Sequence, residues 1–410
     1  NMISRRIYAA ALATLSWLAA FPQTRLTLEE CVAVAEKNSY GIKAAEGEAE
    51  KARIMQGTAW DMEKTSLSLK QDPTSGGSPD NSLSVSQSFE FPTVYALRRK
   101  SLKAETEVAK SRAKLIRKQL AAEVAETYMQ MVFALEKKRI LSAQDTIVSE
   151  YLRLATVRYG AGEARQLEKL TASRMKSENS MEQESADAEL LALRHRMQEL
   201  LNTSEEILPV EGELKPLPWD GGAEFDFSRT AEGKYSSNAL ETARRKVSEA
   251  KGGWLPNFSV GLSGQMVLKG WNPYNVDRSR FSGGDFMGFE VGVGLPLFFG
   301  STRAKVRAAS KDRETAELYA MQARQRGETE YRVQRDKCLA ARRRIDRYQG
   351  GGLAEAHEME RIAKVSYENG DIGYVEYMQS LMESSDTRLK YAETVRDYNL
   401  AVLRLRNMLK

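Results

Sequence analysis

The side chains best suited to chemistry are few in this sequence and lie far apart. The two histidines, His195 and His357, each lie in a charged helical stretch, and neither belongs to a cluster with metal-ligand spacing. The glycines at 350–352 lack the preceding strand and the following lysine of a phosphate-binding loop, so a helix break is the better interpretation. Cys31 and Cys338 favour lone buried or helical thiols over a redox pair or a disulfide. The sequence therefore predicts no enzyme, no cofactor and no resident metal.

Composition narrows the remaining classes of function. Fifteen methionines suggest a metal relay, but Met378 and Met382 lie at i and i+4 on an apolar stripe, where core packing is the better interpretation. The net charge is only +5 although 29% of the residues are charged, and no block of Lys and Arg is interleaved with aromatics. This pattern argues against a nucleic-acid partner and suits long helices with solvated faces.

The first residues have the features of a secretory signal peptide, which we expect at 1–22. Arg5 and Arg6 form a positive region, and an apolar run follows that is too short to span a membrane as a helix. Thr27 and Glu30 then form a capping pattern for a first helix that continues to about residue 60. The chain is therefore expected outside the cytoplasm.

The longest feature is residues 93–159, which contain no Gly or Pro. Pro92 lies at the start and glycines lie at the end, as expected for a helix. Such a helix is about 100 Å long at 1.5 Å rise per residue, so it must run beside other long helices. The reversal at 159–162 leads into a second such stretch at 163–208, and together they predict a helical hairpin over 93–208.

Two segments alternate apolar and polar residues, which is typical of strands with one apolar face. The first pair of strands is expected over 66–91, around a loop at 72–81, and the second over 258–297, around a loop at 269–285. One face carries Leu, Val, Phe and Met, and the other carries Ser, Gly and Gln. Gln87 is an exception, because it falls on the apolar face.

The same order of elements occurs twice: a helix, a strand pair, a long helix, a turn and a returning helix. One structural repeat is expected at 23–208 and another at 231–410, joined by an irregular linker at 209–230. The second helical hairpin is expected over 301–410, with its long helix interrupted at 350–352. The sequence therefore predicts one internal duplication, in a chain that is mainly α with a small β part.

The predicted strands fit a transmembrane β-barrel with lipid outside and water inside. The alternative is a soluble layer packed on the helices, but those helices are already committed to coiled-coil packing. Four strands cannot close a barrel, and unpaired backbone groups in hydrocarbon cost several kcal/mol each. Several copies of the chain must therefore donate four strands each, with the loops at 72–81 and 269–285 on the extracellular side.

These features together resemble the TolC family of outer-membrane efflux proteins. The resemblance is carried by the duplicated plan, by the junctions FEFP at 89–92 and LPLFFG at 295–300, and by the tips VRYGAG at 157–162 and VSYENG at 365–370. The segment at 86–92 is most similar to the heavy-metal cation branch of CusC and CzcC. The family implies a homotrimer in outer-membrane lipid of a Gram-negative bacterium, with a twelve-stranded barrel continued by a helical tunnel through the periplasm.

The resemblance also implies a function and partners. The chain would be a passive channel of a tripartite efflux system, receiving substrate, such as heavy-metal cations, from an inner-membrane RND-type transporter through a periplasmic adaptor. In the family, acidic residues six positions after each tip glycine help to close the periplasmic mouth, and these positions hold Glu168 and Glu376. The second acidic ring of some members falls where this chain has the amide Gln379, so this chain departs from the family there, and Asp371 and Arg165 are nearby candidates for ion pairs. The expected adaptor contacts are the tip residues Tyr159, Gly160, Gly162, Tyr367, Asn369 and Gly370.

Two alternatives stay open at this stage. The same channel could serve drug efflux or type I protein secretion, because the pump selects the cargo. A soluble periplasmic adaptor or coiled-coil rod belongs to another class. Two hairpins with duplicated amphipathic strand pairs argue against it, since an adaptor usually has one.

Overall fold

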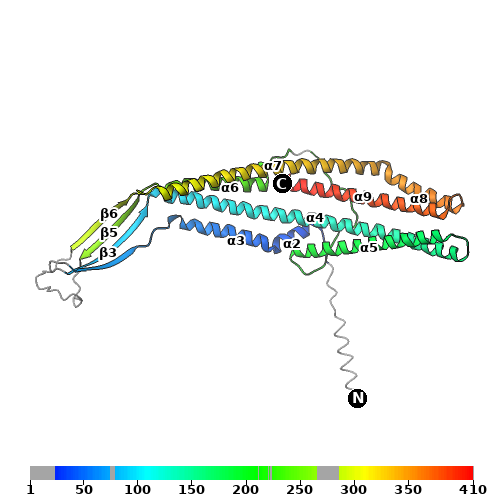
Figure 1. The fold of residues 1–410 in the computed structure, drawn as a ribbon, viewed down its shortest axis with the longest axis horizontal. Coiled ribbons are helices and arrows are strands. Elements are labelled where there is room, and N and C mark those ends of the chain that lie inside the picture. The colour runs from blue at the N-terminus through cyan, green and yellow to red at the C-terminus, as the bar shows by residue number, and fades with distance from the viewer. Residues whose placement is uncertain are drawn as a thin grey trace, which may run out of the picture. The chain divides into compact units, whose positions relative to one another are not determined.

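Figure 1 shows the fold of the chain in a computed structural model, which describes residues 24–73, 79–210, 212–219, 221, 224–265 and 286–409. The expected signal peptide at 1–22 and the expected loop at 269–285 lie outside these residues. The helices are α2 (Leu28–Asn38), α3 (Tyr40–Met55), η1 (Gln56–Trp60), α4 (Pro92–Gly160), α5 (Gln166–Leu201), η2 (Phe227–Arg229), α6 (Ala231–Gly252), α7 (Gly300–Arg347), η3 (Tyr348–Gly352), α8 (Leu353–Glu368) and α9 (Tyr374–Leu409).

The two predicted strand pairs form a single four-stranded antiparallel sheet, in the order β2-β3-β5-β6. The first repeat contributes β2 and β3 and the second contributes β5 and β6, so the repeats meet at the β3–β5 pairing. The alternating faces stay in register across the sheet, because Val85 pairs with Leu67 and Leu262. The strands are β2 (Ser66–Pro73), β3 (Pro79–Glu90), β5 (Asn257–Gln265) and β6 (Phe286–Gly294).

The first helical segment differs from the prediction. Instead of one helix to residue 60, α2 ends at Asn38 and α3 begins at Tyr40. Ser39 leaves the helical conformation, and its hydroxyl accepts a hydrogen bond from the N–H of Ile42 at 3.2 Å. The predicted cap at Thr27 is confirmed as a capping box with Glu30.

The predicted helix over 163–208 is too long at both ends. The structure places α5 at Gln166–Leu201, and Asn202 closes it in the left-handed conformation, with φ of 50°. Residues beyond it form β4 (Ile207–Pro209), which pairs in parallel with β1 (Thr24–Leu26). These three-residue strands are too short to show an alternating pattern in the sequence.

The long helices of the two repeats have matching lengths but different continuity. α4 is one helix of 69 residues. In the second repeat, α7, the π-helical turn η3 and α8 have 48, 5 and 16 residues, which together equal the length of α4. Gly351 has non-helical dihedral angles within η3, so the predicted break at 350–352 is confirmed.

The chain divides into two compact units that differ from the predicted repeats. One unit contains Leu115–Thr230 and Gln325–Lys410 together with the residues up to Lys43, and the other contains Ala44–Lys114 and Ala231–Arg324. Each unit takes one part from each repeat, because helices of both repeats pack together within it. None of the described helices is long and apolar enough to cross a membrane.

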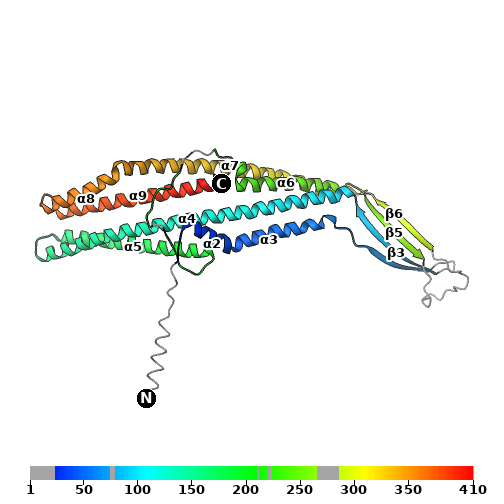
Figure 2. The ribbon, with the colours of Figure 1, turned by 180° about the vertical axis from the view of Figure 1, so that it is seen from behind.

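The first unit has separate apolar clusters along its helices. One cluster joins α2, α4 and α5 around Cys31 and Tyr128. Another joins α7 and α9 around Cys338 and Tyr398. Both cysteines are buried thiols outside any disulfide, as predicted, and burial raises the pKa of the Cys338 thiol to about 11. Figure 2, seen from behind, shows α8 and α9 side by side, as Figure 1 does.

Candidate functional site

The tip of the α4–α5 hairpin is a tight turn closed by backbone hydrogen bonds. The N–H of Gly162 bonds to the carbonyl of Tyr159 at 3.1 Å, and the N–H of Glu163 bonds to the carbonyl of Arg158 at 2.8 Å. Gly162 has φ of 76°, which a residue with a side chain adopts only with strain. This is the Schellman pattern for ending a helix.

The tip of the α8–α9 hairpin has the same turn. The N–H of Gly370 bonds to the carbonyl of Tyr367 at 3.1 Å, and the N–H of Asp371 bonds to the carbonyl of Ser366 at 2.8 Å. Gly370 has φ of 79°. The two predicted tips are therefore equivalent turns, and Gly160 and Asn369 lie beside them, at the end of α4 and just after α8.

The two predicted gate carboxylates occupy equivalent positions in the first turns of the returning helices. Glu168 lies in the first turn of α5, and Glu376 in the first turn of α9. A negative charge at this position is stabilised by the unpaired N–H groups and the dipole of its helix. Glu168 is half-buried and Glu376 is exposed. The position thus has a structural reason to be acidic besides any role in a gate.

The predicted ion-pairing residues of the tips have no ion-pair partner among the described residues of one chain. Arg165 precedes α5 and caps it without a side-chain hydrogen bond, and its side chain is exposed. Asp371 is exposed in the second turn. Across the described residues, neither side chain forms an ion pair with Glu168 or Glu376. Their role in links between copies of the chain stays a prediction.

The tyrosines of the two tips have different surroundings. Tyr159 is 41% exposed, and the ammonium group of Lys169 lies 5.3 Å from the centre of its ring. Tyr367 instead stacks on Tyr377 with ring centres 5.0 Å apart, and it lies 5.1 Å from Tyr374. Among the described residues, the second tip is therefore joined to an aromatic cluster and the first is not.

Sequence reasoning missed the rest of this cluster, which we call the tyrosine cluster: Tyr151, Tyr367, Tyr374 and Tyr377. The ring of Tyr374 lies 4.9 Å from that of Tyr151 on α4, so the cluster connects the second hairpin to the first. Tyr151 and Tyr374 are both buried. Tyr374 and Tyr377 lie three residues apart on α9, but Tyr367 belongs to α8 and Tyr151 to α4, and no local pattern indicates that these rings meet.

Burial dominates the electrostatics of the tyrosine cluster. It raises the pKa of Tyr374, and the neighbouring Tyr367 and Glu150 raise it further. It also raises the pKa of Tyr151, and the carboxylate of Glu168 adds to this effect. The hydroxyl of Tyr151 is buried without a hydrogen-bond partner among the described residues. Burial therefore keeps Tyr151 and Tyr374 neutral, and the cluster holds chiefly through ring packing.

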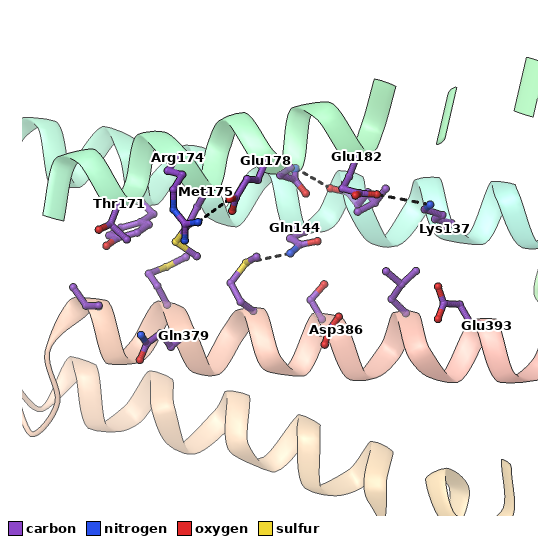
Figure 3. A pocket seen from close by; sticks show the side chains of 18 residues that line it. Lys137, Gln144, Thr171, Arg174, Met175, Glu178, Glu182, Gln379, Asp386 and Glu393 are labelled. Carbon is purple, nitrogen blue, oxygen red and sulfur yellow. Dashed lines mark hydrogen bonds and ion pairs between the residues drawn. The ribbon is translucent and has the colours of Figure 1, made fainter. Parts of the chain in front are cut away.

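A cavity of about 590 Å³ lies between the α4–α5 and α8–α9 hairpins. Gln379 on α9 is one of the residues that line it, and Figure 3 shows its side chain on the side of α9 turned away from Arg174 and Glu178 of α5. The predicted position of a second acidic ring is therefore an exposed amide at the edge of a cavity. Met378 is buried, as predicted from its apolar stripe, whereas Met382 lines the cavity and is half-buried.

A polar network joins α4 to α5 beside this cavity. Asp145 accepts hydrogen bonds from Lys176 at 2.5 Å and from the amide of Asn179 at 2.9 Å. The hydrogen bond from Lys176 is the main reason that the pKa of Asp145 is lowered. Asn179 is buried, and its side-chain oxygen has no partner among the described residues. The network therefore fixes the spacing between α4 and α5 and leaves the side-chain oxygen of Asn179 as an unpaired acceptor.

The sheet presents a continuous apolar face. Leu67 on β2, Leu262 on β5 and Phe289 on β6 share this face and are 70%, 56% and 81% exposed. Met287 and Val291 extend it along β6 and are 82% and 65% exposed. No described part of the chain covers these side chains. Exposed apolar surface of this extent marks a binding or membrane surface.

The opposite face of the sheet is polar and carries small residues. Ser86, Gly261 and Glu290 lie in one row across three strands. Gln87, the exception on the apolar face, has hydrogen-bond partners for both ends of its side-chain amide. Its NH2 group donates to the carbonyl of Glu63 at 2.6 Å, and the hydroxyl of Thr65 donates to its oxygen. The departure from alternation thus has a structural reason at the start of the β2–β3 pair.

Metal binding by acidic, histidine or cysteine side chains has no candidate in the described part of the chain, where no three such groups come together. His195 lies beside Gln198 on an exposed face of α5.

This chain matches known proteins in its three-dimensional structure but not in its sequence. No family model matches the sequence, and no curated protein matches it. A membrane protein from Pseudomonas aeruginosa aligns with a TM-score of 0.78 at 17% identity, over 96% of this chain and 98% of its own. The CmeC outer membrane channel of Campylobacter jejuni aligns with a TM-score of 0.77 at 16% identity, over 93% of this chain and 85% of its own.

CusC, whose structures are described in terms of transmembrane channel formation, aligns with a TM-score of 0.76 at 14% identity, over 95% of this chain and 94% of its own. At such identities the likeness establishes the fold. The predicted fold class is thereby confirmed: a mainly α chain with a small β part, built like the chains of outer-membrane channels.

Proposed function

We propose that this chain is one subunit of a passive outer-membrane channel. The observation that carries the proposal is the sheet, which exposes Leu, Val, Met and Phe on one face and small polar residues on the other. Membrane strands need this alternation, with lipid on one side and water on the other. A soluble adaptor or coiled-coil rod would leave the apolar face in water, so the exposed face favours the membrane.

The open edges of the sheet support assembly into a trimer. β2 and β6 are the outer strands, and among the described strands each has one partner. Unpaired backbone groups in hydrocarbon cost several kcal/mol each, and closed barrels begin at about eight strands. Three copies with four strands each would close a barrel, and their hairpins would form a tunnel in the periplasm.

The partners we propose are a periplasmic adaptor and an inner-membrane RND-type transporter. A conduit of this kind encodes no energy source, so the pump would supply both the work and the choice of cargo. The tips at Gly162 and Gly370 are the surfaces we assign to the adaptor. Adaptor binding would open the mouth only if the adaptor binds the open state more tightly than the closed one.

Glu168 and Glu376 are the gate residues we propose, and heavy-metal cations are the cargo. Three copies would place six carboxylates around the periplasmic mouth, and rings of carboxylates favour cations in channels. Arg165 and Asp371 have no ion-pair partner within the described part of one chain and would be available for links between copies.

The gate is tested by single-channel recording of the purified protein in planar bilayers. Replacing Glu168 and Glu376 together by alanine should raise the conductance, because the closed mouth loses its acidic contacts. The matched control replaces Glu163 and Glu368, two exposed carboxylates beside the same turns. A double variant that conducts like the control would remove these residues from the gate.

The membrane assignment is tested by a charge on each face of the sheet. Val291→Lys, on the apolar face, should reduce recovery in the outer membrane, since a lysine near the bilayer midplane costs about 2–4 kcal/mol in barrels. Ser263→Lys, on the polar face, is the matched control and should be recovered normally. Equal recovery of the two variants would contradict a lipid-facing sheet.

A further inference from the structure

The two long helices that leave the sheet begin with cations and no acidic residue. β3 and β6 run in the same direction, because each is antiparallel to β5, so α4 and α7 start at the same edge of the sheet (Figure 1). Neither helix has an acidic residue in its first turn, unlike α5 and α9. We call the exposed cations of these two helix starts the basic collar: Arg99, Lys100, Lys103, Arg303 and Arg307.

The two halves of the basic collar lie close together within one compact unit of the chain. The end of α6 packs against both helix starts. The side chain of Val94 on α4 lies 3.5 Å from the position that a Cβ would take on Gly252, and that of Thr302 on α7 lies 3.1 Å from the corresponding position on Gly253. The collar is therefore one surface, to which both repeats contribute.

The fold gains nothing from this concentration of charge. Arg99 and Lys103 lie four residues apart on one helix face, as do Arg303 and Arg307, and like charges at this spacing repel each other. The helix dipole also disfavours cations near a helix start. The charges recur in both repeats, since Arg99 and Arg307 occupy the same position counted from the starts of α4 and α7. This recurrence indicates an anionic partner outside the chain.

A hollow of about 760 Å³ beside the basic collar has balanced charge and is not the anion site. Its charged lining consists of three carboxylates and three cations: Glu63, Glu90, Glu249, Arg98, Lys246 and Lys305. Arg98 is already paired with Glu90 at 2.6 Å. The collar residues do not line this hollow, and within the described part of the chain none of them forms an ion pair. The collar is therefore the surface available to an anion.

Exposed aromatic side chains lie between the sheet and these helices. Phe298, between β6 and α7, is 94% exposed. Its neighbour Phe299 stacks on Trp254, which follows α6, with ring centres 5.5 Å apart, and both rings are partly exposed. Girdles of aromatic residues mark the bilayer interface in membrane barrels. The order of apolar sheet face, aromatic residues and cations thus matches the order of hydrocarbon, interface and headgroup phosphates in a bilayer.

We propose that the basic collar binds the phosphate groups of anionic phospholipid, on the side of the membrane from which the helices leave. The inference rests on the membrane role proposed for the sheet. Arg99 and Arg307 lie about 10 Å along their helices at 1.5 Å rise per residue, and a headgroup layer is about 5–8 Å thick on each side of a bilayer. Side chains on a helix lean toward its N-terminus, so these long cations reach back toward the sheet and the headgroups.

The test reconstitutes the purified full-length protein in vesicles that mix phosphatidylcholine with phosphatidylglycerol. Quenching of tryptophan fluorescence by the brominated form of each lipid then gives the preference for the anionic one. The parent protein should prefer phosphatidylglycerol. A collar variant should lose at least about fivefold of that preference, the scale expected for a single Lys or Arg at an anionic surface. It replaces four cations by glutamine: Arg99, Lys103, Arg303 and Arg307.

The matched control removes the same number of cations farther along the same two helices. Its four residues are exposed and also become glutamine: Arg112, Lys114, Arg343 and Arg344. This control should keep the lipid preference of the parent protein, because its cations lie well beyond a Debye length of about 8 Å from the collar. Equal preferences in the collar variant and the control would overturn the proposal.

Three further measurements decide the assignment. Raising the salt concentration should remove the preference of the parent protein, because salt screens exposed charges, and a preference that survives high salt would overturn the collar. Inorganic phosphate at constant ionic strength should leave the preference intact, and its loss would assign the collar to free phosphate instead of lipid. The melting temperature of the collar variant in uncharged detergent should not fall, since a fall would show that these cations serve the fold.

The same experiment separates this proposal from the proposed function. Protein that does not insert into the vesicles would contradict the membrane channel, and the collar with it. Protein that inserts but shows no preference between the two lipids would contradict the collar alone and leave the channel standing.

Discussion

The two hairpins end in the same turn but are supported differently. The α4–α5 tip carries an exposed Tyr159 and continues from a helix of 69 unbroken residues. The α8–α9 tip places Tyr367 in the tyrosine cluster, and α8 is separated from α7 by the π-helical turn η3. A local glycine signal fixed the turn in both repeats, whereas contacts between helices made the repeats different.

The difference indicates which hairpin is suited to move. η3 weakens the continuity of the second hairpin, and the tyrosine cluster ties that hairpin to α4 through Tyr151 and Tyr374. The first hairpin is held by apolar clusters between α4 and α5 and also by polar contacts, such as Asp145 with Lys176. In the channel we propose, opening would release the tyrosine cluster while α4 and α5 stay together.

The largest effect should come from Tyr374→Ala. This side chain is buried at the centre of the tyrosine cluster, and removing a buried aromatic ring typically costs about 3–5 kcal/mol. Thermal unfolding should show a clearly lower melting temperature for Tyr374→Ala. Tyr159→Ala, which removes the exposed tyrosine of the other tip, should change the melting temperature little. Similar losses for both variants would show that the tips are supported alike.

Tyr151→Phe should instead stabilise the fold. The hydroxyl of Tyr151 is buried without a partner among the described residues, so removing it relieves a desolvation cost of about 1–3 kcal/mol. The ring contact with Tyr374 is kept. Denaturant titration should give a higher midpoint than for the parent protein. A lower midpoint would mean that the hydroxyl bonds to a group outside the single described chain, such as a second copy.

The glycines of the two turns should respond equally to substitution. Gly162→Ala and Gly370→Ala each place a side chain at positive φ, which costs about 1–2 kcal/mol, and in neither case would the new Cβ contact another atom within 4 Å. The two losses in unfolding free energy should therefore agree within error. A much larger loss at Gly370 would show that the second tip has support beyond its backbone turn.

The smallest expected effect is a pH dependence of the unfolding free energy that arises in the first hairpin. Hydrogen bonding to Lys176 lowers the pKa of Asp145 in the folded state. The associated stability is therefore present above the ordinary Asp pKa of about 4 and is lost as the pH falls through the lowered value. Asp145→Asn should flatten the acid side of the stability profile by about 1 kcal/mol or less.

The control for that variant is Asp386→Asn in the second hairpin. Asp386 and Lys390 are 55% and 61% exposed, against 26% and 31% for Asp145 and Lys176. Solvent screens exposed pairs, so Asp386→Asn should change the acid profile less. The profiles come from denaturant midpoints measured across the acid range, and a larger change for Asp386→Asn would reverse the comparison.

Much of the fold could be predicted because its signals are local. Alternating residues identified both strand pairs, and the glycines that end the two long helical stretches identified both tips, where the structure gives Gly162 and Gly370 a positive φ. The break at 350–352 was also visible as three consecutive glycines. Each of these features depends on a few neighbouring residues, which the sequence displays directly.

The rest depends on contacts between distant segments. The tyrosine cluster requires the rotation of α4 that brings Tyr151 to Tyr374, and no pattern in α4 reports it. The parallel pairing of β1 with β4 joins strands of three residues, too short for a periodicity. The early end of α5 depends on Asn202 adopting the left-handed conformation. Asparagine tolerates this conformation, but its presence in a sequence does not predict it.

The central claim is that this chain needs copies of itself to complete a membrane sheet. The most direct measurement is the mass of the purified protein in detergent by light scattering, with the bound detergent subtracted. The account predicts three copies of the 46.0 kDa chain, less any leader removed on export, and aggregation when the detergent is withdrawn. A monomer or dimer that stays soluble without detergent would contradict it, because the apolar face of the sheet would then have to be covered in some other way.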